Sequence, residues 1–245
     1  MTAPLFHVER GSLQDLAPGA HVSVGGAEAR HAVSVRRIAP GEQVIVADGA
    51  GQAVLGTVEA ADAAELVVRV EARRDEPQPS PRLVLVQALA KGAATRTRSS
   101  RQLGVDEVVP WESERAIVRW RGPKVAKSHQ KWVNVVTAAA KQSRRARTPE
   151  VAQPVSTRRL LARVEQGVVA LVLHEDATTP LAAVELPADG DVLLLVGPEG
   201  GMSPVEVDRL VAAGATPVRL GPGVLRASTA GPAAIAVLSA RARWR

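Results

Sequence analysis

The sequence predicts an α/β protein in two parts, a small β-barrel followed by a larger domain built on a parallel sheet. Three observations predict it. Residues 1–72 hold five short β-type runs bounded by turn signals. Residues 73–82, RRDEPQPSPR, contain three prolines and resist both helix and sheet. From residue 83, near-continuous apolar runs alternate with helical stretches, a pattern typical of strands buried on both faces.

The first part is expected to be a barrel over residues 1–72. Its predicted strands are 5–9, 21–24, 43–48, 53–58 and 66–71. The pair Asp48-Gly49 marks a turn between two of them. A helix is predicted at 27–37, stopped before Pro40-Gly41. Residues 73–82 are expected to be a linker.

The second part, residues 83–245, is expected to form a parallel sheet covered by helices. Its predicted strands are 83–89, 105–110, 168–174, 191–197 and 216–221. Its predicted helices are about 124–143, 157–166, 204–213 and 228–241.

The composition limits the function classes. The chain carries 31 Lys and Arg against 25 Asp and Glu, and a net charge of +6 favours a polyanionic partner. Cysteine is absent, which excludes disulfides, thiolate metal sites and a cysteine nucleophile. The first residues lack a basic segment followed by an apolar run, and no apolar stretch reaches the roughly 20 residues that span a bilayer. We therefore expect a soluble, cytoplasmic protein.

The first candidate site is LLLVGPEGGMSPVEVDRL, residues 193–210, where a buried strand runs into a glycine-rich bend and then a helix. Ser203 is a plausible N-cap, Pro204 fits the first helical position, and Glu206 has capping-box spacing. Glycines directly after a strand let the backbone approach a ligand, at the strand end where α/β sheets bind ligands. A merely tight strand-to-helix connection explains the pattern equally well.

The second candidate is RLGPGVLRASTAGPAAIAVL, residues 219–238, a strand end, a ten-residue loop and an apolar helix. The loop has one charged side chain, Arg226, and Val224-Leu225 resemble the wall of an apolar pocket. We expect Gly231-Pro232 to lie in the first turn of the helix, since proline is tolerated there. A salt bridge to a nearby carboxylate is the alternative explanation of Arg226.

Several common catalytic patterns are missing. The sequence has no GxxxxGK[ST], no GxSxG and no GxGxxG. Its five histidines are scattered without HExxH spacing, so no metal is expected.

Both candidate segments resemble the C-terminal motifs of the RsmE family within the SPOUT superfamily. Further matches are RHAVSVRRIAPGEQV (30–44), ALAKG (88–92), LGVDEVVPWESERAIVRW (103–120) and AAAKQSRRARTPEV (138–151), in the family's order. The resemblance implies S-adenosylmethionine-dependent methylation of N3 of uridine 1498 in 16S rRNA. It also implies a SPOUT-type α/β domain with a deep trefoil knot, a PUA-like RNA-binding barrel before it, and a homodimer that acts on 16S rRNA or the small ribosomal subunit.

The resemblance also assigns residues. The cofactor pocket should include His174, Glu175, Val196, Gly197, Glu199, Gly200, Gly201, Leu220, Gly221, Val224, Leu225, Arg226, Ser228, Thr229 and Ala230. Arg226 is the candidate for stabilising charge on the uracil oxygens, and Glu199 is a candidate base. RNA contacts would come from Arg30, His31, Arg36, Arg37, Gln142, Ser143, Arg144, Arg145 and Arg147. For these charge runs, a solvated surface is the alternative.

One segment departs from the family pattern. Residues 93–102, AATRTRSSRQ, lack acidic residues and have almost no apolar stripe, which puts the packing of the first helix in question. The departure motivates a rival hypothesis, an RNA-binding or ribosome-assembly protein with a decayed methyltransferase site. A third hypothesis is a nucleotide-dependent enzyme on the same α/β layout, which would bind a dinucleotide instead of a methyl donor.

Overall fold

The computed structural model describes residues 3–93, 100 and 103–244. The chain divides into two compact units, each described by itself. The N-terminal unit comprises Met1–Gln78 and Ala140–Thr148, and the C-terminal unit comprises Pro79–Ala139 and Pro149–Arg245. The atypical segment 93–102, whose packing the sequence puts in question, lies almost wholly outside the described residues.

The N-terminal unit is built on one five-stranded sheet. Its strands are β1 (Leu5–His7), β2 (His21–Gly25), β3 (Gln43–Ala47), β4 (Ala53–Ala61) and β5 (Glu65–Arg73). They pair in the order β1-β3-β4-β5-β2, with β1 parallel to β3 and the other pairs antiparallel. The predicted strands are confirmed. The sheet is a half-barrel, as in PUA-like domains, with β1 and β2 at its edges, which do not pair with each other within the described residues.

The helix predicted at 27–37 is confirmed in two pieces. An α-helix, α1 (Gly26–Arg30), continues into a single π-helical turn, η1 (His31–Val35). Ala29 and Ala32 face the core of the sheet and are buried, whereas Arg30, His31, Arg36 and Arg37 are exposed.

The short segment 140–148 joins this unit through specific contacts. The ammonium of Lys141 pairs with the carboxylate of Glu28 on α1. The backbone N–H of Thr148 donates to the carbonyl of Gly49 at 2.9 Å. The guanidinium of Arg147 donates to the carbonyl of Glu76 at 2.9 Å. These contacts bring a segment some hundred residues away in the chain against α1 and the β3–β4 turn.

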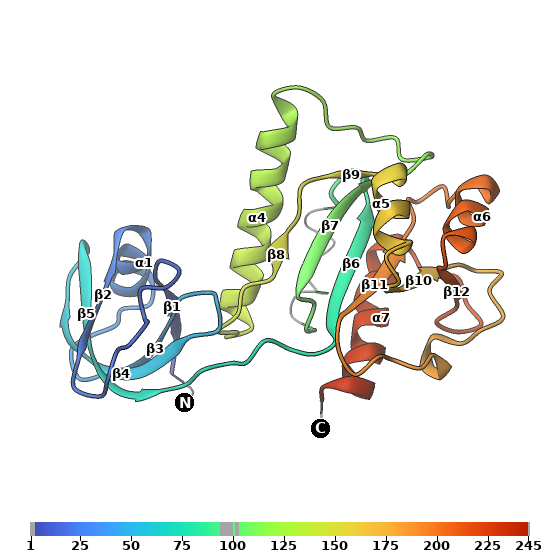
Figure 1. Cartoon of the computed structure of the whole chain (residues 1–245). Helices are drawn as coiled ribbons and strands as arrows, with labels where there is room; N and C mark the ends of the chain where they lie inside the picture. Colours follow the sequence, from blue (N-terminus) through green and yellow to red (C-terminus); the bar gives the residue numbers. More distant parts are fainter. Residues whose placement is uncertain (1–2, 94–99, 101–102, 245) are drawn as a thin grey trace. The chain divides into compact units, whose positions relative to one another are not determined.

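The C-terminal unit contains a seven-stranded sheet in which every recorded pair is parallel. Its strands are β6 (Arg82–Ala88), β7 (Glu107–Glu112), β8 (Glu150–Val151), β9 (Val155–Ser156), β10 (Val169–Leu173), β11 (Asp191–Val196) and β12 (Thr216–Val218). The order is β12-β10-β11-β6-β7-β8, and β9 also pairs with β7. The parallel sheet expected from the apolar runs is confirmed (Figure 1).

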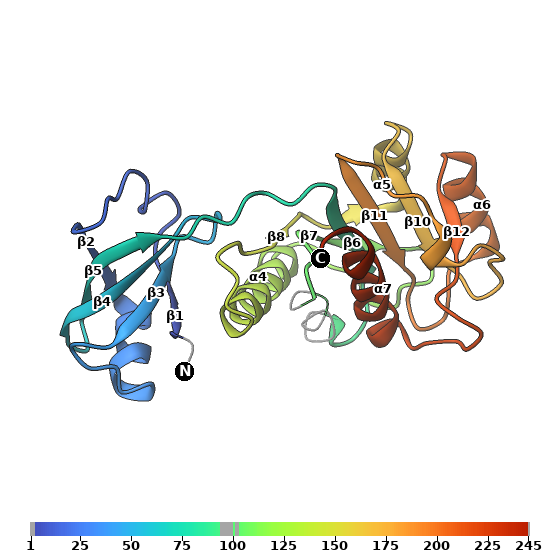
Figure 2. The same cartoon turned by 90° about the horizontal axis from the view of Figure 1, so that it is seen from below.

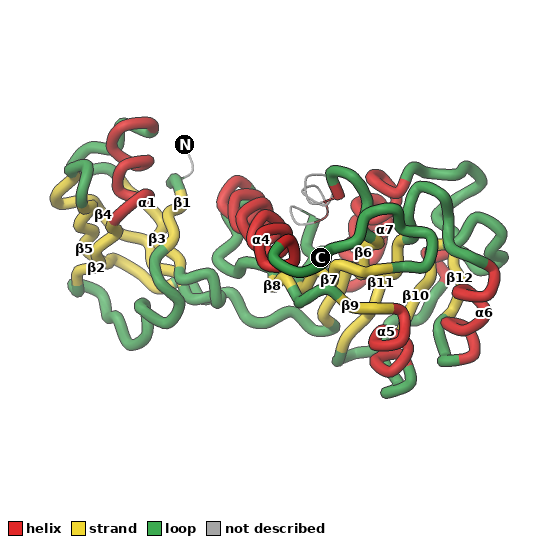
Figure 3. Tube along the Cα trace, turned by 90° about the horizontal axis from the view of Figure 1, so that it is seen from above, coloured by secondary structure: helices red, strands yellow, loops and turns green. Residues whose placement is uncertain are grey.

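Helices cover both faces of this sheet, as Figures 2 and 3 show. They are α4 (Lys124–Gln142), α5 (Thr157–Val164), α6 (Pro204–Ala212) and α7 (Ala227–Ala242), with a short 3-10 helix, η2 (Leu181–Ala183). Successive strand residues point to opposite faces. Leu83 and Leu85 therefore pack in one core with Trp132 of α4 and Ile235 of α7. Val84 and Val86 pack in the other core, which includes Leu160 of α5 and Leu210 of α6.

Ion pairs hold the amino ends of the strands. The guanidinium of Arg163 on α5 lies 3.0 Å from the carboxylate of Glu107 and 2.8 Å from that of Asp191. Arg82 lies 3.3 Å from Glu107. Arg243, after α7, donates to the carbonyl of Gly104 at 2.6 Å and to the carboxylate of Asp106 at 2.5 Å.

None of the helices in the described ranges is long and apolar enough to cross a membrane.

Candidate functional site

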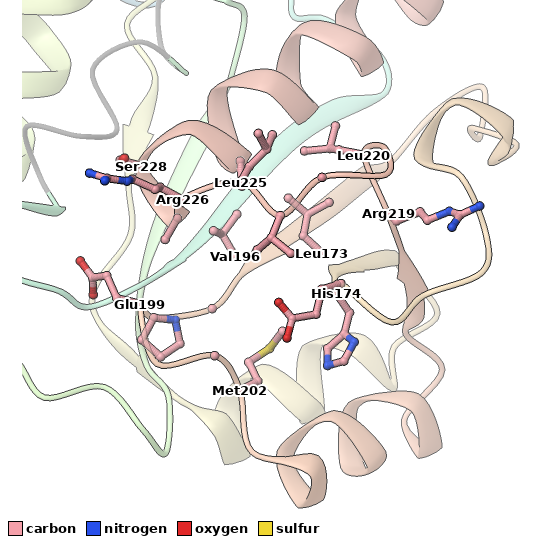
Figure 4. Close-up of a pocket in the computed structure, with 18 of the residues that line it drawn as sticks. Leu173, His174, Val196, Glu199, Met202, Arg219, Leu220, Leu225, Arg226 and Ser228 are labelled. Carbon is pink, nitrogen blue, oxygen red and sulfur yellow. The ribbon is translucent and has the colours of Figure 1, made fainter.

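A pocket of about 810 Å³ opens at the carboxyl ends of three neighbouring strands, β10, β11 and β12. Because these strands are parallel, the segments that follow them meet at one edge of the sheet. His174 and Glu175 follow β10, residues 197–203 follow β11, and residues 219–226 follow β12. All three segments line the pocket (Figure 4).

The centre of the pocket is apolar. Leu173 and Val196, the last residues of β10 and β11, lie between the loops, with Leu220 and Leu225 nearby (Figure 4). Val224 is 76% exposed and Leu225 42% exposed, although both are large apolar side chains in a loop. Apolar side chains held open at a pocket suit a flat apolar ligand.

Four glycines of the pocket lining border open space. A Cβ atom placed on Gly200, Gly201, Gly221 or Gly223 would meet no other atom within 4 Å. A larger side chain at Gly200 or Gly221 would therefore enter open space beside the pocket without striking the protein. Gly197 differs, because its Cβ would lie 3.0 Å from the side chain of Met202. Its lack of a side chain serves the packing of Met202 beneath the loop.

The loop after β12 offers unused donors. Within residues 103–244, the backbone N–H groups of Leu220, Gly221, Val224 and Leu225 donate to no protein acceptor. These N–H groups lie on a largely exposed loop that lines the pocket, so they are available to the polar edge of a ligand.

Titratable side chains lie on two sides of the apolar centre. Arg226 and Glu199 lie on one side, and His174 and Arg219 lie on the other (Figure 4). The carbonyl of Arg226 accepts from Thr229 and Ala230 at 2.8 and 2.9 Å, which fixes its backbone at the start of α7. The side chain of Arg226 remains exposed.

Helix α7 corrects one expectation. The helix begins at Ala227, so Pro232 lies in its second turn and not in the first. Proline has no N–H, and the carbonyl of Ser228, four residues earlier, loses its helical hydrogen bond. Ser228 lines the pocket, so this interruption occurs next to the site.

The start of α6 follows the prediction only in part. Ser203 is the N-cap, and its hydroxyl accepts from the N–H of Glu206 at 3.0 Å. The carboxylate of Glu206 does not complete the capping box. It accepts instead from the hydroxyl of Thr157 at 2.6 Å and from the N–H of Glu114 at 2.9 Å. Burial raises the pKa of Glu206 above its ordinary range.

The segment after β7 reaches the same edge of the sheet and supplies a residue that sequence reasoning missed. One guanidinium nitrogen of Arg115 lies 3.4 Å from the carbonyl oxygens of Gly200 and Met202, and Arg115 lines the pocket. The available signal was its place three residues after a strand, inside the matching segment 103–120.

The structure gathers the predicted cofactor residues with one exception. Every one of them lines the pocket except Thr229, which is exposed on the first turn of α7. The lining also includes residues that were not predicted: Arg115, Leu173, Pro198, Met202, Val218, Arg219, Pro222, Gly223 and Ala227.

The two predicted RNA-binding runs both belong to the N-terminal unit. Arg30, Arg36, Arg37 and Arg144 are exposed. Arg147 is half-buried and is engaged with Glu76.

No group of three or more histidine or carboxylate side chains within the described ranges is arranged to hold a metal ion.

Comparisons with known proteins agree with this architecture. Residues 76–239 match the RNA methyltransferase domain family, and residues 24–71 match the RNA methyltransferase PUA domain family. The ribosomal RNA small subunit methyltransferase E of Mycobacterium bovis is 41% identical over 251 aligned positions, which cover 100% of this chain and 94% of the relative. Its counterpart in Bacillus subtilis is 26% identical over 89% of each chain.

Solved structures give the same result. The crystal structure of ribosomal RNA small subunit methyltransferase E from Neisseria gonorrhoeae, bound to S-adenosyl methionine, superposes with a TM-score of 0.85, with 26% identity over 98% of both chains. A Legionella pneumophila protein in complex with the bound cofactor SAM gives a TM-score of 0.82, with 27% identity over 98% of both chains. The chain belongs to the ribosomal RNA small subunit methyltransferase E family.

Proposed function

We propose that this chain transfers the methyl group of S-adenosylmethionine to N3 of a uridine in 16S rRNA, at the position the family resemblance implies, uridine 1498. As a family member the chain is an rRNA methyltransferase. The observation that supports the finer proposal most is that one pocket, at the ends of β10, β11 and β12, is lined by all but one of the residues assigned to the cofactor.

The residues present fit S-adenosylmethionine. The apolar centre formed by Leu173, Val196 and Leu225 suits the faces of adenine, and the free N–H groups of the loop after β12 suit its polar edge. The open space beside Gly200 and Gly221 lets backbone approach the ligand. Glu199, at the pocket, supplies the negative charge that a sulfonium cation favours.

When bound, S-adenosylmethionine supplies an electrophilic methyl group on a positively charged sulfur. The chain must hold the uracil ring so that N3 is in line with that methyl group. Arg226 would stabilise negative charge on the uracil oxygens as the N3 proton leaves. Glu199 lies on the same side of the pocket and is our candidate to accept that proton (Figure 4).

We assign RNA backbone contacts to the exposed arginines of the N-terminal unit, Arg30, Arg36, Arg37 and Arg144. Arginine matches phosphate geometry, and the unit carries both predicted basic runs. The functional division we propose is an RNA-binding region at 1–72, a linker at 73–82 and a methyltransferase region at 83–245.

The decisive experiment uses small ribosomal subunits from a bacterial strain that lacks its own enzyme of this family. Incubation with the protein and S-adenosylmethionine should add one methyl group, and mass mapping should locate it on N3 of uridine 1498. A methyl group on another nucleotide would contradict the proposed position. No transfer, with no cofactor binding in calorimetry, would favour the decayed-site hypothesis, and binding of a dinucleotide would favour the third hypothesis.

We also propose that the enzyme is a homodimer that acts in the cytoplasm, where the small subunit is assembled. This rests on the family resemblance. Light scattering on the purified protein should give twice the chain mass of 25.7 kDa.

A further inference from the structure

The segment that follows β7, residues 113–120, has a backbone held by short hydrogen bonds. The guanidinium of Arg119 donates to the carbonyls of Ser113 and Glu114 at 2.8 and 2.9 Å. The N–H of Glu114 donates to the buried carboxyl of Glu206 at 2.9 Å. These bonds fix the segment against the start of α6.

The side chain of Glu114 is also engaged. Its carboxylate accepts from the hydroxyl of Ser203 at 2.5 Å and pairs with Arg209 at 3.0 Å. Ser203 is the N-cap of α6, directly after the glycine-rich loop. The segment is therefore attached to the cofactor loop through residues other than Arg115.

Arg115 stands apart from this network. It is exposed, it lines the pocket, and its contacts with the protein are long, 3.4 Å from one nitrogen to the carbonyls of Gly200 and Met202. Within the described ranges its other two guanidinium nitrogens have no acceptor. A guanidinium carries five donors in a planar fork, so most of its hydrogen-bonding capacity is unused. A fixed backbone thus presents a nearly free arginine beside the pocket.

We propose that Arg115 binds a phosphate of the RNA strand next to the nucleotide whose base enters the pocket. The proposal rests on the proposed function, because it takes RNA as the substrate. A planar fork with unused donors suits phosphate, which accepts from arginine in a bidentate manner. Arg115 would then be a positioning residue that fixes the strand, while Arg226 acts at the base.

The test compares Arg115→Gln with Arg158→Gln, an exposed arginine on α5 that is not part of the pocket lining. The probe is a fluorescein-labelled oligouridylate, whose affinity is measured by anisotropy at several salt concentrations. Loss of one phosphate contact should reduce the slope of log affinity against log salt by about 0.7 in Arg115→Gln. Arg158→Gln should keep the wild-type slope, and Arg115→Lys should largely restore it, since a positive charge remains.

Two further measurements separate the explanations. Calorimetry should give Arg115→Gln an affinity for S-adenosylmethionine within about twofold of wild type, because Ser203, Glu114 and Glu206 still hold the cofactor loop. On small subunits, KM for the RNA substrate should rise while kcat at saturation changes little. An unchanged salt slope with a weakened cofactor affinity would overturn the proposal, since Arg115 would then bind the cofactor carboxylate or support its loop.

An equal decrease of the salt slope in Arg158→Gln would also overturn the proposal. The effect would then come from the lower net positive charge of the protein and not from a contact made by Arg115. Failure of the proposed function is distinguishable. In that case the wild-type protein leaves the small subunit unmethylated, whereas the slopes with oligouridylate still report whether Arg115 contacts phosphate.

Discussion

The carboxyl of Glu206 accepts a hydrogen bond from the hydroxyl of Thr157 at 2.6 Å, in a place that solvent does not reach. The same oxygen accepts from the N–H of Glu114, and the other oxygen has no partner within the described ranges. One side chain therefore joins the first turn of α6, the first residue of α5 and the segment after β7. Loss of the hydrogen bonds of Glu206 would therefore loosen all three of these segments at once.

The raised pKa of Glu206 predicts a pH dependence of stability. A carboxyl whose folded-state pKa lies above its unfolded value binds its proton more tightly when folded, so its contribution falls as pH rises between the two values. Glu206→Gln cannot ionise and keeps an acceptor oxygen. The melting temperature of the variant, relative to wild type, should rise with pH above the ordinary carboxyl range. If the melting temperatures of variant and wild type change with pH in parallel, this expectation is wrong. Glu165→Gln, at an exposed position, is the matched control.

Gly200→Val should fold normally and lose S-adenosylmethionine. The new side chain meets no protein atom near its Cβ, so the fold has room for it, but it extends into the pocket. Calorimetry should show affinity weakened by at least about 100-fold, with circular dichroism unchanged. Gly25→Val, at an exposed position of β2, is the control and should bind as the wild type does. Retained affinity in Gly200→Val would place the cofactor elsewhere.

Arg226→Ala should fold and reduce kcat for methylation by about 10²-fold, the typical effect of removing one donor to a developing negative charge. Arg219→Ala removes a guanidinium from the other side of the pocket and should reduce kcat far less (Figure 4). Single-turnover assays on small subunits measure both. If Arg226→Ala methylates at the wild-type rate, the role given to Arg226 is wrong.

Arg163→Ala should destabilise the C-terminal unit. Glu107 is 8% exposed and, among the described residues, would keep Arg82 alone as an ion-pair partner, so the loss should be about 2 kcal/mol, below the range for a fully buried pair. Thermal unfolding should shift down by roughly 4–8 °C. Arg69→Ala breaks an exposed pair with Glu59 and should change stability by less than about 1 kcal/mol. Similar losses in both variants would show that burial of Glu107 is not the cause.

The local elements could be predicted because their signals are local. Apolar runs located the predicted strands to within three residues at either end, and Ser203 and Pro204 located the start of α6. Strands β8 and β9 were not predicted, since two residues carry no periodicity. The prediction of a trefoil knot came from the family resemblance alone. The path of a chain through its own loops leaves no pattern of residues in the sequence.

Contacts between residues far apart in the chain could not be predicted either, because they leave no local pattern in the sequence. The spacing of Ser203 and Glu206 predicts a reciprocal capping box, but the carboxylate found Thr157 and Glu114, residues brought near only by the sheet. Residues 140–148 lie in the middle of the chain and nevertheless belong to the N-terminal unit, through Lys141 and Arg147. Arg115 reaches the pocket because β7 is parallel to β6, which periodicity does not reveal.

The three segments around the pocket end at positions 175, 202 and 230 of the chain. During translation the last of them leaves the ribosome several seconds after the first, at about 5–20 residues per second. Until then no complete binding site exists, and the donor molecule cannot act as a scaffold for the growing polypeptide. Ligand concentration can therefore shift the equilibrium between finished and unfolded molecules, but not the order in which the nascent protein assembles.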